Sequence, residues 1–538
     1  MYVDPCGRSS ADVYNPRVSE AAPPPLLASP ASPPPGIGSR PAVVLVALCG
    51  ALGAVIRLPF IDKRPLWFDE LGIASRLLND GLLFRITDPQ APAPPGFHVL
   101  VWMTVRLLGK SEWVWRLWPY LLGVGSVALI ALLLARLAGP WAAVAGAYLL
   151  ATRAWPVAYS AELKPYSSDG FFALLCLLAA QRIFASTSLQ ALLAAGACFA
   201  LAPWFSYTSI FVIGGVLIAG LLSACRRERR RELLPWAALA AGSAASIAIL
   251  YLLVISPQRA RFLLRWWERR GGFPPTGSAS ALLQWLARNL EGLFDGLLIP
   301  NLPYAGIVYA LLFLAGCLWL FRRGSGRLAL AVAASLLLPL AASFLRLYPF
   351  AASGAELRSR VMLFFVPLVL VIVSCGIIGG MAALERARFG PAMAGVILVL
   401  LFWPGLSQIP LLFREPVLRV VEPNRDLFDI LRRSARPDDL LFVNYPGWRS
   451  FYMYGDGIPC RATVGVRPRA YTTSVEELTP QIAPLLKSEK RVWLFCCSPD
   501  NPEENERLKR TASLYRSLKL VAGEGNTLLF LSEPPSAL

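Results

Sequence analysis

The chain has 538 residues, of which 56% are hydrophobic and only 16% are charged, and its mean hydropathy is +0.52. This composition excludes an ordinary soluble enzyme and is typical of a protein whose main solvent is lipid. The formal net charge of +18 could indicate nucleic-acid binding, but most Lys and Arg residues stand in short segments beside apolar runs, where they anchor membrane helices. We therefore expect a membrane protein that does not bind nucleic acid.

Residues 1–40 form a Pro-rich segment that contains PPPLLASPASPPPG and no periodic apolar pattern. Such a segment buries too little apolar surface to fold, which predicts a disordered tail. The apolar run 41–56 follows without a small-residue cleavage site, so we expect a first membrane span and not a signal peptide.

Residues 41–411 are predicted to form an α-helical polytopic membrane domain with about eleven spans, because apolar runs near twenty residues long recur through it. The runs are neither alternating nor heptad-like, which disfavours strands and coiled coils. After 41–56, the spans are expected at 117–137, 140–157, 166–184, 189–206, 208–224, 234–255, 303–321, 328–347, 360–380 and 391–411.

Short basic turns predict the orientation of these spans, because the positive-inside rule places such turns in the cytoplasm. All of the basic turns fall on the same side of the membrane as the N-terminus if residues 94–109 (PPGFHVLVWMTVRLLG) lie along the membrane surface instead of crossing it. The prolines, His98 and Arg106 make this segment a poor span but an acceptable interfacial helix. We therefore expect a protein of the cell inner or plasma membrane with a cytoplasmic N-terminus. The basic turns lie near Arg136 and Arg182 and at 226–231 (RRERRR), 322–327 and 385–388.

Residues 421–538 predict a small α/β domain, which the same orientation makes extracytoplasmic. An amphipathic helix in DLFDILRRSARPDDLLFVNYP precedes the apolar runs RVWLFCC and LKLVAGEGNTLLFLSEP, and the polar helical stretch EENERLKRTASLYRSL stands between these two runs. Neither GxGxxG nor a Walker loop is present, so no nucleotide site is indicated. Ten cysteines without a CxxC pair and a single histidine argue against a structural zinc site or haem.

The first predicted outer segment contains RLPFIDKRPLWFDELGIASRLLNDG, in which Asp69 and Glu70 follow a Trp-Phe pair near the end of the first span. A carboxylate at a membrane interface is costly unless it is solvated or paired, so this acidic pair is a candidate catalytic site. The alternative is that both residues stabilise the N-terminus of a helix that begins near Leu71.

The second predicted outer segment, AYSAELKPYSSDG, crowds charged and aromatic residues between two apolar spans. A cation beside carboxylates at the level of the lipid head groups suits a phosphate-bearing lipid. The alternative is a set of ion pairs that tethers the loop. The residues concerned are Glu162, Lys164, Tyr166 and Asp169.

Two later outer segments are rich in arginine. ARFLLRWWERRGGFPP interleaves arginines with Trp266 and Trp267, as expected for an interfacial helix at anionic head groups. RLYPFAASGAELRSRVMLFFVP brings Tyr348, Arg358 and Arg360 to the ends of spans, where they either bind a phosphate or only anchor the spans at the interface.

The order of these motifs resembles the GT-C superfamily of glycosyltransferases that use polyprenyl-phosphate sugars, in particular bacterial relatives of protein O-mannosyltransferases and the aminoarabinose transferase of lipid A. The resemblance covers roughly residues 42–380. FDE is similar to the acidic motif of the family's first external loop, PPGFHVL to its KPPL-type segment, YSAELKPYS to its Y-S-x-E-x-R-x-Y segment, and YPF with RSRVMLFFVP to its late span-entry motif. Lys164 stands where an Arg is common, and Ala93 or Pro94 stands where the KPPL form has its lysine.

This resemblance implies a hexosyl- or pentosyltransferase that moves a sugar, with inversion, from a polyprenyl-phosphate donor to a lipid, glycan or protein acceptor on the outer face. Asp69 would be the general base, and Glu70 or Glu162 would orient it or the sugar. Lys164 with Arg358 or Arg360 would neutralise the leaving lipid phosphate. No cofactor is required, although a divalent metal is conceivable because some superfamily members use one. The implied binding residues are Glu162, Lys164, Tyr166, Asp169, His98, Tyr348, Arg358 and Arg360.

A polytopic transporter or lipid-sugar flippase without transferase activity is the main alternative, because many spans with charged residues also describe such proteins. The charged clusters stand in predicted loops and not in the middle of spans, which favours the enzyme. A catalytically silent relative that acts as an assembly subunit is a third interpretation.

Overall fold

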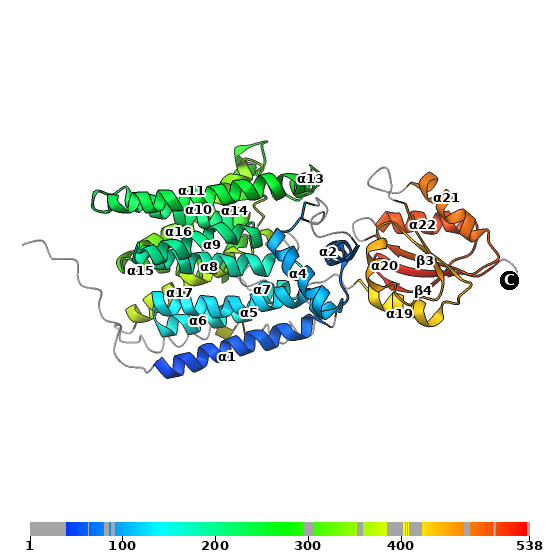
Figure 1. The fold of residues 1–538 in the computed structure, drawn as a ribbon, viewed down its shortest axis with the longest axis horizontal. Coiled ribbons are helices and arrows are strands. Elements are labelled where there is room, and N and C mark those ends of the chain that lie inside the picture. Colours follow the sequence, from blue (N-terminus) through cyan, green and yellow to red (C-terminus); the bar gives the residue numbers. More distant parts are fainter. Residues whose placement is uncertain are drawn as a thin grey trace, which may run out of the picture. The chain divides into compact units, whose positions relative to one another are not determined.

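The computed structural model describes the chain from residue 39 to residue 534, with gaps (Figure 1). Most of the predicted tail, residues 1–38, and most of the predicted span 391–411 lie outside the described residues. The described residues are 39–62, 64–79, 86–87, 92–259, 261–294, 305–351, 359–384, 402–403, 405, 407, 422–466, 474–498 and 502–534.

Ten of the predicted spans appear in the described part of the chain as apolar helices that pack side by side in one bundle (Figure 1). These helices are α1 (Ser39–Arg57), α5 (Glu112–Leu137), α6 (Pro140–Thr152), α8 (Tyr166–Ala185), α9 (Leu189–Phe205), α10 (Ser209–Ala224), α11 (Leu233–Leu250), α15 (Ala305–Arg322), α16 (Gly326–Phe344) and α17 (Phe365–Leu384). The segments between them contain η1 (Leu58–Phe60), α2 (Phe68–Asn79), α4 (Pro95–Leu108), α7 (Ala154–Tyr159), η2 (Arg227–Glu232), η3 (Tyr251–Ile255), α12 (Ser256–Gln258), α13 (Arg261–Arg269), α14 (Ala279–Phe294) and η4 (Ser359–Met362).

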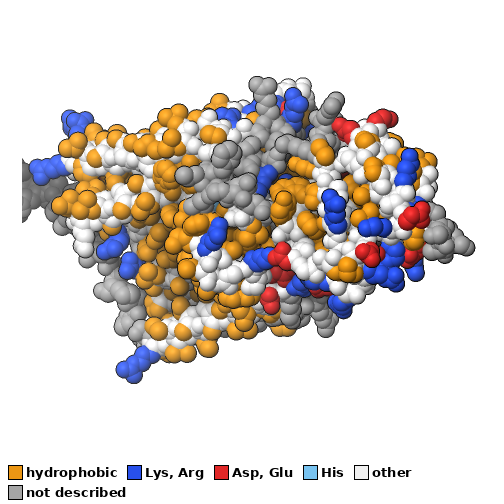
Figure 2. Space-filling model, turned by 45° about the vertical axis from the view of Figure 1, so that its right-hand side comes forward, with side chains coloured by type: hydrophobic (Ala, Val, Ile, Leu, Met, Phe, Trp, Pro, Cys, Tyr) orange, Lys and Arg blue, Asp and Glu red, His pale blue; other side chains and the backbone are white. Residues whose placement is uncertain are grey.

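The surface of this bundle is apolar. Six of the described helices are long and apolar enough to cross a membrane, and the other helices at predicted spans are shorter. Large aliphatic side chains stand exposed along them, including Leu193, Leu234 and Leu252, which are 65%, 79% and 70% exposed. Figure 2 shows hydrophobic side chains spread over the helical part of the molecule. An exposed apolar surface of this extent fits contact with lipid, so the chain is an α-helical polytopic membrane protein.

Helices α15 and α17 approach each other closely because glycines stand at their contact. A Cβ atom on Gly316 would lie 2.0 Å from the carbonyl oxygen of Ile372, and one on Gly376 would lie 2.0 Å from that of Leu312. Any larger residue would push the two backbones apart. Small residues at helix contacts are the usual means of close packing between membrane helices, where no hydrophobic effect drives association.

The connecting segments gather at the two ends of the bundle. Figure 1 shows α2, α4, α7 and α13 at one end, while the RRERRR turn between α10 and α11 lies at the other. Helix α4 corresponds to the predicted interfacial segment. Its 14 residues span about 21 Å, which is less than the thickness of a bilayer core. Phe97 and Val101 are buried on one side of α4, whereas Leu107 is exposed.

Residues 422–534 include the predicted α/β domain, whose five-stranded sheet has the order β2-β1-β3-β5-β4. Strand β1 pairs in parallel with β2 and β3, and β5 pairs antiparallel with β3 and β4. Helices α19 and α20 pack on one face of the sheet and α21 and α22 on the other, so the central strand β3 is buried on both faces. The elements are α19 (Asn424–Ser434), β1 (Leu440–Val443), α20 (Trp448–Tyr454), β2 (Arg461–Val464), α21 (Val475–Leu486), β3 (Val492–Cys497), α22 (Pro502–Ser513), β4 (Lys519–Glu524) and β5 (Thr527–Ser532).

One hydrophobic core joins the α/β domain to the segments around α2 and α4. Leu66, Phe97 and Trp115 belong to the same buried cluster as Phe428 and Tyr454 of the C-terminal domain. The domain therefore has a packed contact with the part of the chain that carries Asp69.

Candidate functional site

Asp69 and Glu70 lie in the first turn of α2, which begins at Phe68. The backbone N–H of Trp67 donates a hydrogen bond to Oε2 of Glu70 at 3.2 Å, so Glu70 caps the helix start. Both carboxylates thus stand at a helix N-terminus, where negative charge is favourable, as the alternative interpretation of this pair required. The two side chains, however, contact different residues.

Asp69 faces two cations from distant parts of the chain. Its Oδ2 atom lies 3.5 Å from Nζ of Lys164, in the loop before α8, and 3.3 Å from Nη1 of Arg360, in η4. The side chain of Asp69 remains 31% exposed. Burial by itself would raise the pKa of Asp69, but the neighbouring cations, Lys164 first among them, hold this pKa below its ordinary value. Asp69 is therefore an ionised carboxylate that another molecule can reach.

Aromatic residues hold Arg360 in place. The hydroxyl of Tyr348 donates a hydrogen bond to the carbonyl oxygen of Val361 at 2.7 Å, which fixes the short helix η4. The Tyr348 ring in turn lies 5.0 Å from that of Phe211 on α10. The guanidinium of Arg360 lies 5.9 Å from the Tyr166 ring. Tyr348 and Tyr166, both predicted to bind substrate, thus support the arginine that contacts Asp69.

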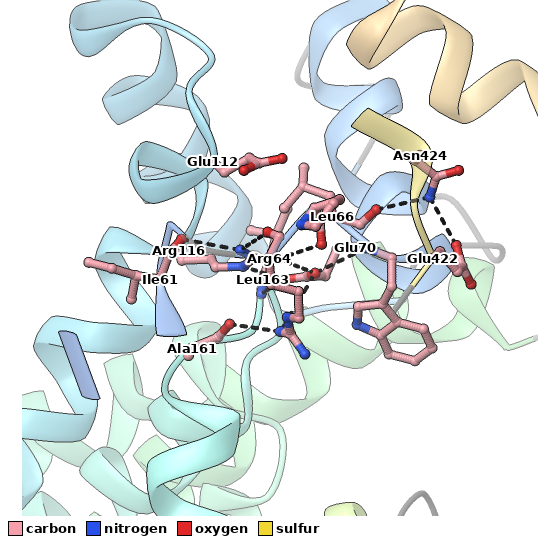
Figure 3. A network of polar contacts seen from close by, with 12 residues as sticks. Ile61, Arg64, Leu66, Glu70, Glu112, Arg116, Ala161, Leu163, Glu422 and Asn424 are labelled. Atoms are coloured by element: carbon pink, nitrogen blue, oxygen red, sulfur yellow. Dashed lines mark hydrogen bonds and ion pairs between the residues drawn. The ribbon is translucent and has the colours of Figure 1, made fainter. Parts of the chain in front are cut away.

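Glu70 forms a buried ion pair with Arg116 of α5 (Figure 3). Nε and Nη2 of Arg116 donate to the two carboxylate oxygens of Glu70 at 2.8 and 2.7 Å, and both side chains are fully buried. This two-point geometry is the strong form of an arginine–carboxylate contact. Glu70 is therefore enclosed, in contrast to Asp69.

The Glu70–Arg116 pair also forms hydrogen bonds with the backbone of the loops around it. Nη1 and Nη2 of Arg116 also donate to the carbonyl oxygens of Ile61, Arg64 and Pro65 at 3.1, 2.7 and 3.1 Å. The backbone N–H of Leu163 donates to Oε1 of Glu70 at 2.8 Å. Because Leu163 precedes Lys164 and Glu70 follows Asp69, this network sets the spacing between Lys164 and Asp69.

Glu162 is the second buried carboxyl of the cluster. It is 1% exposed, and no described residue forms a hydrogen bond with its Oε2 atom. Burial raises the pKa of Glu162 to about 7, and Arg64 offsets only part of that effect. The carboxyl therefore changes charge near neutral pH, next to a set of fixed charges.

We expect Glu162 to make the unfolding free energy depend on pH between its ordinary pKa of 4.5 and its native value of about 7. The native state binds more protons than the unfolded state in this window, so the stabilising contribution is present below pH 4.5 and is lost as the pH rises to 7. Denaturant unfolding of the wild type and of Glu162→Gln, measured from pH 4 to 8, checks this. The unfolding free energy of the wild type relative to Glu162→Gln should be greatest at low pH and should fall as the pH rises. A difference in unfolding free energy that stays constant with pH would contradict the prediction.

The remaining predicted site residues have other positions. Asp169, in the first turn of α8, accepts a hydrogen bond of 2.6 Å from the hydroxyl of Ser206, which ties α8 to the turn between α9 and α10. His98 is buried on α4 beside Phe97. Arg358 lies outside the described residues. The geometry therefore gathers Asp69, Lys164 and Arg360, with Glu162 and Tyr166 close by.

The C-terminal domain is hydrogen-bonded to the segment that leads into α2. The hydroxyl of Tyr454, at the end of α20, donates to Glu112 at 2.6 Å and accepts from the backbone N–H of Leu66 at 2.8 Å. Nδ2 of Asn424, at the start of α19, donates to the carbonyl oxygen of Leu66 at 3.2 Å. These contacts bring α20 against α2.

The sequence analysis missed Arg116 and Arg449. Arg116 directly precedes the predicted span 117–137, and this position indicates anchoring of the span as readily as an ion pair. Arg449 lies in the C-terminal domain, and its guanidinium lies 4.3 Å from the Phe68 ring. Nothing in the local sequence around Arg449 indicates that contact.

The arrangement can bind an anion and hold a reachable carboxylate beside it. Lys164 and Arg360 lie beside Asp69, and the described residues contain no cluster of three or more His, Cys, Asp or Glu side chains placed to hold a metal ion.

Comparisons with known proteins show what the chain is similar to. Residues 92–257 match the family model described as dolichyl-phosphate-mannose-protein mannosyltransferase. No curated protein matches the chain by sequence. The fold is similar to that of ArnT from Cupriavidus metallidurans, with a TM-score of 0.53 and 15% identity over 91% of this chain and 98% of that chain in the apo state. The structure of that protein bound to undecaprenyl phosphate matches with a TM-score of 0.53 and 16% identity over 92% and 98% of the two chains.

The fold is also similar to that of an archaeal oligosaccharyltransferase, AglB from Archaeoglobus fulgidus. The complex with an inhibitory peptide and a dolichol-phosphate matches with a TM-score of 0.50 and 12% identity over 88% of this chain and 71% of that chain. A complex of the A. fulgidus enzyme with Zn and sulfate matches with a TM-score of 0.53 and 13% identity over 90% and 72%. At these identities the likeness shows the fold, which is the GT-C fold. The predicted resemblance to the GT-C superfamily is thus confirmed, and the matched segment 92–257 contains the PPGFHVL and YSAELKPYS motifs.

Proposed function

We propose that this protein, a multi-pass membrane protein with the GT-C fold, transfers a sugar from a polyprenyl-phosphate donor to an acceptor, with Asp69 as the general base. The observation that carries the proposal is the pairing of one reachable carboxylate with Lys164 and Arg360, which come from two other connecting segments. ArnT has been crystallised with undecaprenyl phosphate and AglB with a dolichol-phosphate, which supports a lipid phosphate as the leaving group.

In this reaction the acceptor oxygen attacks the anomeric carbon from the side opposite the phosphate. The bond between that carbon and the phosphate oxygen breaks, and its electron pair stays on the lipid phosphate. Lys164 and Arg360 would bind this phosphate and stabilise the charge that develops on it. The proton of the acceptor hydroxyl goes to Asp69. Because a phosphate is a good leaving group, no strong general acid is needed.

The basicity of Asp69 should depend on whether the donor is bound, because Asp69 pairs with the two cations that would bind the donor phosphate. In the free protein, Lys164 and Arg360 depress the pKa of Asp69 and make it a weak base. A donor phosphate bound to the same two cations supplies a competing negative charge, which raises that pKa again. Asp69 therefore becomes a better base once the donor is in place.

The other predicted site residues receive supporting roles in this proposal. Glu70 is a positioning residue, because its pairing with Arg116 occupies both of its oxygens. Glu162 is a candidate for accepting a hydrogen bond from the sugar, since its Oε2 atom has no partner among the described residues. Tyr166 and Tyr348 support Arg360, and Asp169 ties helices together. No role is proposed for a metal, although a structure with a similar fold, that of the A. fulgidus oligosaccharyltransferase, contains Zn.

The proposal places the reaction on the extracytoplasmic face. The RRERRR turn lies at the end of the bundle opposite α2 and α4, and the positive-inside rule assigns such a turn to the cytoplasm. The N-terminus would then be cytoplasmic and the α/β domain extracytoplasmic. A flippase remains the alternative function, since a lipid phosphate site alone would also serve one.

Transfer of radiolabelled sugar from synthetic polyprenyl-phosphate sugars tests the proposal. We expect the purified wild type to label an acceptor in a membrane extract. Lys164→Gln should lower the rate about 10²-fold or more, because it removes a charge from the leaving phosphate. Lys110→Gln, which changes an exposed lysine paired with Asp456, is the matched control and should keep the wild-type rate. Movement of labelled lipid across proteoliposomes without any transfer from a broad donor panel would replace the transferase with a flippase.

A further inference from the structure

Helix α13 packs one of its sides against the short helix that carries Arg360. Trp267 of α13 is buried in a small core with Phe273 and Ala351, and Val361 of η4 packs against the same core. Arg360 and Val361 are neighbours in η4. The apolar side of α13 therefore supports the helix from which Arg360 reaches the candidate site.

Hydrogen bonds tie the C-terminal end of α13 to the same region. The carbonyl oxygen of Gly272 accepts from the backbone N–H of Phe350 at 2.8 Å and from the hydroxyl of Ser343 at 3.2 Å. The hydroxyl of Tyr348, two residues before Phe350, donates to the carbonyl oxygen of Val361 in η4. Helix α13, the segment after α16 and η4 thus form one packed unit.

The outer side of α13 is positively charged. Arg265, Arg269 and Arg270 are exposed, and no ion pair is found for them among the described residues. Glu268, the one acidic residue of the helix, pairs with Arg346 instead. Residues four apart in a helix share a side, so Arg265 and Arg269 point the same way. Arg265, Arg269 and Arg270 form the cationic face of α13.

This cationic face lies where the bundle meets the membrane surface. Figure 1 shows α13 at the same end of the bundle as α2 and α4. Helix α13 follows η3 and α12, and in η3 the side chains of Leu252 and Leu253 are exposed and so face lipid. The guanidinium carbon of Arg270 lies 3.8 Å from the centre of the Trp266 ring. Tryptophan is enriched where membrane helices meet the head groups, and clustered arginines there attract anionic lipids.

We propose that the cationic face of α13 binds the phosphates of anionic phospholipids in the surrounding bilayer, and that this contact holds η4, and with it Arg360, in the position that binds the donor. The second part rests on the proposed function. Guanidinium groups without acidic partners attract anionic head groups more strongly than zwitterionic ones, whose phosphate is offset by an ammonium group. A lipid that restrains α13 also restrains η4, because the two share the core around Trp267.

Hydrogen exchange of the full chain in nanodiscs tests this contact locally. Amide exchange is compared between discs of phosphatidylcholine alone and discs that also contain phosphatidylglycerol. We expect the anionic lipid to slow exchange in residues 261–272 and 359–363 about threefold or more. Changing the whole cationic face to glutamine, in Arg265→Gln with Arg269→Gln and Arg270→Gln, should remove this effect. Lysine at the same three positions should keep most of it, because lysine keeps the charge.

The matched control removes three exposed arginines from the RRERRR turn at the other end of the bundle, in Arg227→Gln with Arg230→Gln and Arg231→Gln. The control loses the same charge and should still show slower exchange in α13 and η4 with the anionic lipid. Equal exchange of wild-type α13 in both lipids overturns the proposal. So does a control that loses the effect as fully as the α13 variant, because the response would then be to net charge. Slower exchange in α13 with no change in η4 overturns the link to Arg360.

Transfer in proteoliposomes tests the functional part. The wild-type rate should rise about threefold to tenfold when phosphatidylglycerol is added, and the glutamine variant of the cationic face should keep the rate found in phosphatidylcholine alone. A wild-type rate that does not respond to the anionic lipid overturns the link to Arg360. If no donor is turned over while exchange in α13 and η4 still depends on the anionic lipid and on the cationic face, the proposed transferase fails and the lipid contact stands.

The donor itself is the competing ligand for these arginines. Undecaprenyl phosphate is therefore added to discs of phosphatidylcholine alone, and exchange in residues 261–272 is measured again. We expect little change there, because the donor phosphate would bind at Lys164 and Arg360. If undecaprenyl phosphate slows exchange in α13 as much as phosphatidylglycerol does, and through the same three arginines, the cationic face belongs to the donor site and the proposal is overturned.

Discussion

Asp69→Asn should lower kcat for sugar transfer by about 10²- to 10⁴-fold, the range expected when a general base is removed. Asparagine keeps the shape of the side chain but cannot take the acceptor's proton. The same change removes the negative charge 3.5 Å from Lys164 and 3.3 Å from Arg360, which frees both cations for the donor phosphate. We therefore expect the affinity for undecaprenyl phosphate to stay the same or to rise while catalysis fails.

A general base should lose the transfer rate and keep donor binding when it is replaced, whereas a structural residue should lose both. Donor affinity and single-turnover transfer should be measured on the same preparation, with Asp62→Asn as the control, because Asp62 is an exposed aspartate seven positions earlier in the same connecting segment. A parallel loss of lipid binding and rate in Asp69→Asn would assign Asp69 to binding, and wild-type turnover would remove it from the mechanism.

Glu70→Ala should lower the free energy of unfolding by about 3–5 kcal/mol, because it leaves the fully buried guanidinium of Arg116 without its carboxylate. The loss is large since Glu70 also caps α2 and accepts from the Leu163 backbone N–H, so three segments lose a common partner (Figure 3). Removing both members of the pair, in Glu70→Ala with Arg116→Met, should cost less than the sum of the two single changes.

Denaturant unfolding in mixed micelles measures these differences. Lys509 and Glu506, which form an ion pair within α22, offer a control pair, and Glu506→Ala should cost about 1 kcal/mol or less because both side chains are exposed to solvent. A Glu70→Ala protein as stable as this control would show that Arg116 is held by the three loop carbonyls alone. The positioning role of Glu70 would then have to be given up.

These two predictions assign the neighbouring carboxylates Asp69 and Glu70 to different tasks. The division has a simple physical origin: consecutive residues in the first turn of a helix point in directions about 100° apart. Glu70 points towards α5 and is enclosed by Arg116, whereas Asp69 points towards the loop before α8 and η4 and stays reachable.

The sequence by itself determined the membrane class of the protein and most of its spans. Ten of the predicted spans recur as helices, and the fold has the predicted GT-C resemblance. This information is local, because a run of about twenty apolar residues is sufficient to make a membrane helix whatever the rest of the chain does. The α/β domain was equally predictable, since its amphipathic helix and short apolar strands carry their own periodicity.

Alternation of the spans also predicted which loops share an end of the bundle, and so which charged segments can meet. It could not predict which side chains pair. Arg116 lies 46 positions from Glu70, and Arg360 lies 291 positions from Asp69. Arg449 reaches α2 only because the C-terminal domain packs there. Such contacts depend on the packing of whole helices and domains, and no periodicity in the chain encodes them, so only the tertiary structure decided which carboxylate is enclosed and which one faces the cations.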